Sequence, residues 1–279
     1  MPADFSSAET AYMRLNGLDL AYKQFGAGEP ILFYNRFRGI LDTWDPLFLD
    51  ALANHYQVTV FDYPGVGNSQ GELSTDLIEV ANAGIQLMDS LGHEQFHVGG
   101  WSYGGQVAQV AMFLNQEKVV KSILIGCNPP GRNRIRMKLT FGITAMKATY
   151  DLEDEIQLFF EPNSEKSRQA ARESHERIVA RVDPALIPAD KAILKRYRKG
   201  MRSFNKDRQK FRAAYKTLKT PVLVISGDND RSFNAGNWFP LFRKAPSIQH
   251  LIMHDAGHGS LNQYPELAAK YIHLFLSHA

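Results

Sequence analysis

The stretch GWSYG at residues 100–104 decides the fold of this 279-residue chain. Apolar residues 96–98 precede it and predict a strand, whereas residues 106–113 follow it with helix-forming residues and no proline. Glycines two positions before and after a serine allow a strand and a helix to close around a tight turn. The pattern predicts that Ser102 has a strained backbone and that its hydroxyl stands exposed at the edge of a sheet.

Two later segments carry the partners that a nucleophilic serine needs. Residues 221–230, PVLVISGDND, are typical of a buried parallel strand that ends in a loop with two carboxylates. Residues 251–253 predict another strand, and the sequence DAGHG follows at 255–259. Each candidate side chain therefore comes just after a strand, where open α/β sheets place their sites. The order serine, aspartate, histidine favours catalysis over a glycine-rich turn without chemistry.

With these motifs the sequence resembles the α/β-hydrolase fold family along nearly its whole length. Residues 62–69, DYPGVGNS, resemble the family's D-x-x-G-x-G-x-S loop after its fourth strand. The resemblance implies an α/β fold with a mostly parallel sheet of the eight-stranded type, flanked by helices. It also implies a catalytic triad in which Ser102 is the nucleophile, His258 the base and Asp230 the acid, whereas Asp228 structures the acid loop.

The segment NRFRG at residues 35–39 stands where the family has its H-G-x-x-G oxyanion loop. Asn35 and Arg36 replace the usual His-Gly pair, so the geometry is expected to differ most here. Because oxyanion donors are backbone N–H groups, the loop can act without those side chains. The resemblance implies the amides of Phe37 and Tyr103 as the two donors. We expect other nearby aromatic side chains, such as Trp101, to belong to the core.

A helical insertion interrupts the alternation of strands and helices. Residues 75–91 still predict an amphipathic helix capped by Ser74 or Thr75, but after residue 130 strand patterns stop until residue 222. We predict a helical lid at residues 131–217, inserted into a core of residues 1–130 and 218–279. Residues 131–220 hold 22 of the 32 Lys and Arg but 11 of the 29 Asp and Glu, so their net charge is +11.

The basic lid allows several interpretations. Basic amphipathic helices bind membrane surfaces, nucleic acids or acidic substrates, but charge runs are more often solvated faces. We favour the interpretation in which the basic residues form a solvated exterior of the lid, and the lid faces an acidic core domain. Arg132 and Arg134 closely follow the predicted sixth strand, residues 119–125, and on position alone they are candidates for holding an anionic substrate group. Nucleic acid is not expected, because no recognised binding motif accompanies the charge.

Composition limits the remaining possibilities. Residues 1–10 lack the apolar segment of a secretory signal, and no apolar run approaches the roughly 20 residues that span a bilayer, so we expect a cytoplasmic protein. The single cysteine, Cys127, follows a strand and is expected to be a buried structural thiol. The sequence has no C-x-x-C and no clustered histidines, so we expect no metal and no cofactor. The resemblance to the α/β-hydrolase family implies a small-molecule substrate.

The sequence therefore predicts a serine hydrolase that cleaves a carboxylic ester, or a related acyl bond, of a small molecule through an acyl-enzyme. Serine at position 102 disfavours epoxide hydrolase and haloalkane dehalogenase activity, which in this family use aspartate there. Alternatives of the same fold stay open. They are a cofactor-free lyase, perhydrolase or oxygenase, and a ligand receptor that keeps the triad.

Overall fold

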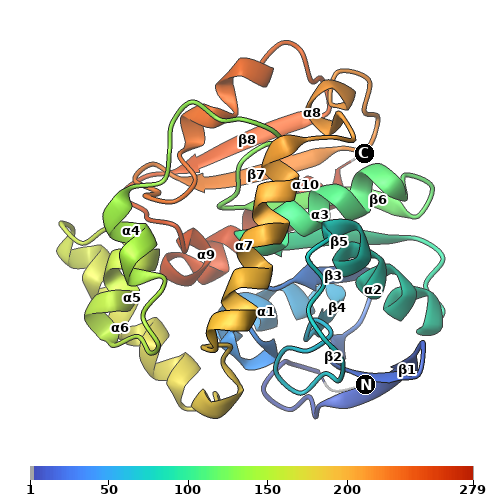
Figure 1. Ribbon diagram of the computed structural model, residues 1–279, viewed down its shortest axis with the longest axis horizontal. Coiled ribbons are helices and arrows are strands. Elements are labelled where there is room, and N and C mark those ends of the chain that lie inside the picture. Colours follow the sequence, from blue (N-terminus) through green and yellow to red (C-terminus); the bar gives the residue numbers. More distant parts are fainter. Residues whose placement is uncertain (1–2, 279) are drawn as a thin grey trace.

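Eight strands form one sheet in the computed structural model, which describes residues 3–278 (Figure 1). The strands are β1 (Ala11–Leu15), β2 (Leu18–Gly26), β3 (Glu29–Tyr34), β4 (Tyr56–Phe61), β5 (Phe96–Trp101), β6 (Val119–Ile125), β7 (Val222–Gly227) and β8 (Ile248–Met253). Their order in the sheet is β1-β2-β4-β3-β5-β6-β7-β8. β2 pairs antiparallel with β1 and β4, and the other neighbours run parallel. The predicted α/β fold class with a mostly parallel sheet is confirmed.

Helices cover both faces of the sheet. They are α1 (Pro46–Ala53), α2 (Leu77–Ser90), α3 (Tyr103–Leu114), α4 (Leu139–Thr144), α5 (Leu152–Phe159), α6 (Glu165–Val179), α7 (Lys191–Lys206), α8 (Phe211–Ala214), α9 (Ser260–Gln263) and α10 (Pro265–Ser277). Along β3 the side chains alternate between two cores, as the period of a strand requires. Leu32 and Tyr34 pack in the core that includes residues of α2 and α3, whereas Phe33 packs in the core that includes residues of α1 and α10.

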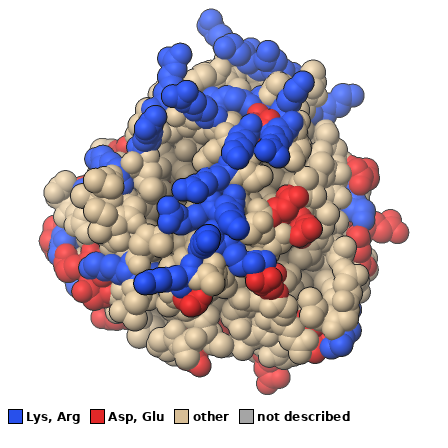
Figure 2. Space-filling model, viewed as in Figure 1, with Lys and Arg blue, Asp and Glu red and all other residues tan. Residues whose placement is uncertain are grey.

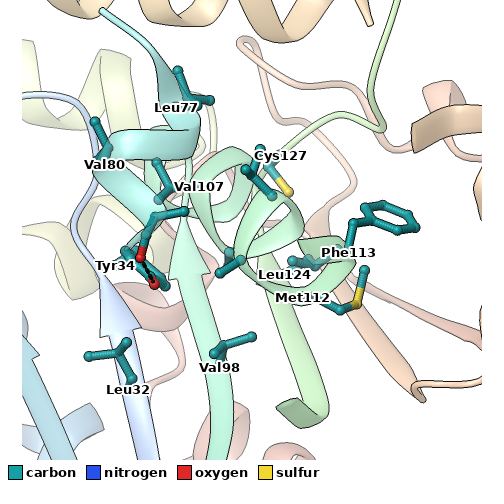
Figure 3. Close-up of a cluster of buried hydrophobic side chains, with 14 of the residues drawn as sticks. Leu32, Tyr34, Leu77, Val80, Val98, Val107, Met112, Phe113, Leu124 and Cys127 are labelled. Atoms are coloured by element: carbon teal, nitrogen blue, oxygen red, sulfur yellow. Dashed lines mark hydrogen bonds between the residues drawn. The ribbon is translucent and has the colours of Figure 1, made fainter. Parts of the chain in front are cut away.

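The first of these cores fixes the strand and the helix on either side of residue 102. Figure 3 shows Val80 of α2 and Val107 of α3 in one cluster with Leu32 of β3 and Val98 of β5. The hydroxyl of Tyr34 donates to the carbonyl of Ala81 at 2.8 Å, so its polar end is satisfied inside an apolar cluster. Cys127 is a free, buried cysteine in the same core, as the sequence predicts.

One helix begins later than the sequence suggests. Asp76 is the N-cap of α2 and accepts the N–H of Ile78 at 2.9 Å, so the prediction of a Ser74 or Thr75 cap is wrong. The hydroxyl of Ser74 instead accepts the N–H of Asp76 at 3.0 Å. A carboxylate at the cap also interacts favourably with the helix dipole, which explains why Asp76 prevails over the two hydroxyl residues.

The loop after β4 is organised around a buried carboxyl group. Asp62 accepts the N–H groups of Leu41 at 2.8 Å and Asn68 at 2.9 Å. A Cβ at Gly67, where φ is +55°, would lie 2.2 Å from Oδ2 of Asp62. Burial raises the pKa of Asp62 to about 7, against the opposite effect of the two N–H groups. The glycine of this motif is thus required for close contact as well as for its backbone conformation.

Between β6 and β7 the described chain forms α4 to α8 and a short 3-10 turn, with no strand. In Figure 1, α7 crosses in front of the sheet, and it contacts α2 and α3. Another part of this helical insertion (residues 131–217), helix α6, is bound to the core through Asp45, the N-cap of α1. The buried carboxylate of Asp45 accepts two hydrogen bonds from the Arg177 guanidinium, at 3.0 and 2.7 Å, and one from Ser174 at 2.8 Å.

Residues 1–2 and 279 of the predicted core lie outside the described residues. Among the described helices, none combines the length and the apolar character that a membrane span requires.

Candidate active site

Ser102 occupies the tight turn between β5 and α3. Its φ of 62° and ψ of −117° fall in a region that L-residues rarely adopt, which is the strain predicted from the sequence. A Cβ at Gly100 would lie 2.1 Å from the carbonyl oxygen of Gly104, and one at Gly104 would lie 1.9 Å from that of Tyr34. The two glycines are therefore needed for strand and helix to approach. The N–H of Ser102 is held by the carbonyl of Ile125 at 2.8 Å.

Asp230 and His258, which follow the turn by more than a hundred residues, form a carboxylate–imidazole pair. Oδ2 of Asp230 lies 2.9 Å from Nδ1 of His258, and both side chains are buried. Oδ1 of Asp230 accepts the N–H groups of Ser232 at 2.7 Å and Phe233 at 2.8 Å, which fixes the carboxylate. A carboxylate acceptor favours the tautomer with the proton on Nδ1. Nε2 of His258 is then free to accept a proton.

The second carboxylate of the acid loop has a different environment. Asp228 accepts the N–H groups of Ala256 and Asp255, each at 3.0 Å, and its Oδ2 lies 3.0 Å from Nδ1 of the exposed His254. These contacts hold the backbone of the loop that carries His258. Asp228 thus supports the position of the histidine without contacting its ring, in contrast to Asp230.

Aromatic side chains surround His258. The centroids of the Phe141 and Phe233 rings each lie 5.5 Å from that of the imidazole, and Trp101 lies at 5.9 Å. Nε1 of Trp101 also donates to the backbone carbonyl of His258 at 2.9 Å. At Gly126, where φ is +50°, a Cβ would lie 3.0 Å from Nδ1. The ring is therefore confined in a largely apolar site.

Side chains hold the start of the 35–39 loop. Nδ2 of Asn35 donates to the carbonyl of Phe61 at 2.8 Å, and its Oδ1 accepts from Nε1 of Trp44 at 2.6 Å. The backbone carbonyl of Asn35 accepts the hydroxyl of Tyr63 at 2.8 Å. Three buried hydrogen bonds thus fix the residue that replaces the usual histidine.

Arg38 connects the same loop to the helical insertion. Its backbone is left-handed, with φ of 61°, and its side chain is buried. Nε donates to the carbonyl of Pro188, Nη1 to that of Lys147 and Nη2 to that of Ala148, each at 2.6 Å. The guanidinium also lies 4.6 Å from the centre of the Tyr150 ring. One side chain of the loop thus joins two segments of the insertion.

Arg36 lies between two aromatic rings. The carbon of its guanidinium is 5.4 Å from the centre of the Trp101 ring and 4.9 Å from that of Phe159. Nη1 donates to the carbonyl of Phe37 at 2.9 Å, whereas the buried Nε has no partner among residues 3–278. Burial lowers the pKa of the Arg36 guanidinium.

A cavity of about 700 Å³ opens beside these groups, which is a typical size for a small-molecule site. Ser102, His258 and Phe37 line it, while the Asp230 carboxylate lies behind the histidine. Tyr103 begins α3, and its buried ring packs against those of Tyr63 and Tyr197 instead of the cavity. The structure thus brings together the predicted serine and histidine, with the loop residue Phe37 beside them.

Five arginines also line the cavity: Arg36, Arg132, Arg136, Arg198 and Arg202. The sequence had indicated Arg132 but not Arg36, Arg136 or the two on α7, and its other candidate, Arg134, does not line the wall. In Figure 2 the basic side chains follow α7 and gather around a hollow in this face. The spacing of four between Arg198 and Arg202 was the available indication that both lie on one side of α7.

Residues 38–270 match the α/β-hydrolase family. The chain is 33% identical over 177 residues to the dihydrolipoyllysine-residue acetyltransferase component of the acetoin cleaving system of Cupriavidus necator, a match that covers 60% of this chain and 46% of that protein. For three further relatives the matched share of their own length is 38% to 59%.

Other similarities extend over nearly the whole chain. Over 272 residues it is 24% identical to the pimeloyl-[acyl-carrier protein] methyl ester esterase of Aeromonas hydrophila, covering 93% of this chain and 100% of that protein. The α/β hydrolase fold protein from Chitinophaga pinensis is 29% identical, with 99% of this chain and 100% of that chain covered and a TM-score of 0.87. The relatives support a hydrolase of this fold, and the chain belongs to the α/β-hydrolase family.

Proposed function

We propose that the protein is a serine hydrolase that cleaves carboxylic esters of small molecules. The observation that carries the proposal is the 2.9 Å contact between Asp230 and His258, on the same cavity as a serine in a strained turn. A buried acid–imidazole pair beside such a serine is the arrangement that activates a hydroxyl for attack. The similarity to an ester esterase supports the choice of substrate class.

In the proposed mechanism, Nε2 of His258 takes the hydroxyl proton of Ser102 as Oγ attacks the ester carbonyl. The amides of Phe37 and Tyr103 stabilise the oxyanion, and Asp230 stabilises the imidazolium. The imidazolium then protonates the departing alcohol, which leaves an acyl-enzyme. Nε2 of His258 then takes a proton from water as the water oxygen attacks the acyl-enzyme carbonyl, and the imidazolium returns that proton to Oγ of Ser102 as the bond to the acyl group breaks and the acid leaves.

We also propose that two parts of the chain have different roles. Residues 1–130 and 218–279 form the core that carries the triad, and residues 131–217 act as a lid over the cavity. The composition of the cavity wall supports this proposal, because residues of α4 and α7 line the cavity together with Ser102 and His258 of the core. An enclosed site strengthens electrostatic interactions with the reacting groups.

The test is the hydrolysis of a panel of p-nitrophenyl esters of increasing acyl length. Ser102→Ala and His258→Ala should each remove most of kcat, and the double variant should lose little more, because both groups serve one proton-transfer step. Asp230→Asn should lower kcat far more than its matched control Asp228→Asn. Additive losses, or the opposite ranking of the two aspartates, would contradict the assignment.

A covalent probe separates the nucleophile from the choice of substrate. A fluorophosphonate should modify Ser102, as detected by mass spectrometry of the peptide, and His258→Ala should suppress the modification. Modification without turnover of any ester would favour the lyase, perhydrolase or oxygenase alternatives. Absence of modification in the native protein would exclude Ser102 as an activated nucleophile.

A further inference from the structure

The charged side chains of the cavity wall are all basic. The five arginines that line it face no acidic residue among the described lining residues. Arg132, Arg136, Arg198 and Arg202 are exposed at the mouth, whereas Arg36 is partly buried beside Phe37 and Ser102. A wall of one sign in a low-dielectric cleft concentrates ligands of the opposite charge.

Arg36 in particular forms no ion pair with an acidic side chain among the described residues. Within residues 3–278 no carboxylate oxygen lies within 4.0 Å of its guanidinium nitrogens, and its one hydrogen bond goes to a neutral carbonyl. Glu155 acts on it electrostatically, but that carboxylate is bound to His175 at 2.9 Å. Arg38 is a like charge and is already engaged by three carbonyls. A partly buried cation without a counter-charge is costly, so an anion that enters the cavity gains from contact with it.

The position of Arg36 relates this charge to the reacting centre. Its guanidinium packs on Trp101 and Phe159, and the same two rings lie against the imidazole of His258. An anion at Arg36 is therefore close to the scissile bond. The remaining wall is mostly apolar, with Met137, Phe141, Leu158 and other carbon-rich side chains.

We propose that the substrate is an acidic ester, and that Arg36 binds a free carboxylate on the same molecule as the ester bond. This inference rests on the proposed function. A carboxylate is favoured over a phosphate because its two oxygens and single charge match one guanidinium, and the donors of the neighbouring Arg38 are already engaged by three carbonyls. The four exposed arginines raise the local concentration of such anions at the mouth.

The first experiment uses the native protein. It compares p-nitrophenyl hemi-esters of succinic, glutaric and adipic acid with matching esters in which a carboxamide replaces the carboxylate. We expect kcat/KM to be tenfold to a hundredfold higher for the carboxylate at one or more of these lengths, from one charge-assisted interaction. Equal kcat/KM for carboxylate and carboxamide at every length would overturn the proposal.

The second experiment assigns the preference to Arg36. In Arg36→Met the ratio of kcat/KM between carboxylate and carboxamide esters should fall close to one, and Arg36→Lys should retain part of it. The matched control is Arg134→Met, which removes an exposed arginine that does not line the cavity and should keep the native ratio. Equal losses for both ester types in Arg36→Met would mean that Arg36 stabilises the oxyanion, which contradicts the proposal.

The third experiment does not need turnover. Calorimetric titration of Ser102→Ala with glutarate monoamide should show binding, and the uncharged glutaramide should bind at least tenfold more weakly. Failure of ester hydrolysis with intact monoamide binding would refute the proposed function alone. Absence of monoamide binding would refute the anion site, and tighter binding of inorganic phosphate than of the monoamide would contradict the choice of a carboxylate.

Discussion

Removal of the Arg38 guanidinium should destabilise the whole protein. Its bond to the Pro188 carbonyl is buried, and the bonds to Lys147 and Ala148 are partly buried. A lost hydrogen bond to a charged group costs about 1.5–3 kcal/mol when the partner stays buried, and about 1 kcal/mol where water can replace the donor. Arg38→Met should therefore lower the free energy of unfolding by about 3–5 kcal/mol.

The chain provides graded controls for this prediction. Arg38→Lys keeps the charge but has a single donor group, so we expect it to recover about 1–2 kcal/mol of the loss. Arg134→Met removes an exposed arginine and should change the free energy of unfolding by less than about 0.5 kcal/mol.

Urea denaturation followed by tryptophan fluorescence measures these differences, and limited proteolysis reports on the insertion itself. Cleavage within residues 131–217 should accelerate in Arg38→Met before the core is attacked, because this side chain joins two segments of the insertion to the 35–39 loop. An Arg38→Met variant within about 1 kcal/mol of the native protein would refute the energetic argument.

Two further predictions concern the loop after β4. Gly67→Ala should destabilise the protein by about 3 kcal/mol or more, since its Cβ would collide with the Asp62 carboxyl group at 2.2 Å, whereas Gly92→Ala, also at positive φ but with nothing within 4 Å, should cost about 1 kcal/mol in thermal or urea unfolding. Comparable losses at the two glycines would show that backbone strain, not the collision, dominates. The pKa of Asp62 is raised from 3.8 to about 7, so the folded state binds the proton more tightly than the unfolded state. Its contribution to stability should therefore be greatest near pH 4 and be lost as pH rises to 7, by up to about 4 kcal/mol. The difference in unfolding free energy between native protein and Asp62→Asn, measured from pH 4.5 to 7.5, should follow this slope, and a constant difference would contradict the raised pKa.

Local patterns were sufficient for most of the fold. Residues 119–125 are apolar enough to define β6 at both ends, and the glycines around Ser102 predict its turn because no other residue fits there. β8 was harder, since the sequence suggested residues 251–253 but the strand begins at Ile248. It is an edge strand with a half-exposed face, where polar residues such as Gln249 are tolerated and local hydrophobicity is a poor guide.

The site was less predictable, because its walls come from distant parts of the chain. Arg36 could be recognised as a departure from glycine, but its packing on Phe159, more than a hundred residues later, depends on where the insertion folds. The expectation of a solvated lid exterior agrees with the exposure of Arg198 and Arg202. It did not include the finding that both side chains also line the cavity. Exposure and orientation toward a cavity are separate properties, and helical periodicity determines neither without the neighbouring elements.

The attachment of the insertion at Asp45 also affects the thermodynamics of ligand binding. Its bonds to Arg177 and Ser174 are made within the folded protein, as are those of Arg38 on the other side. The conformational entropy of these segments is therefore lost during folding, before a ligand enters. The heat capacity change of binding then reflects the apolar surface of the ligand and the walls it covers, without the large contribution that the folding of a disordered segment would add.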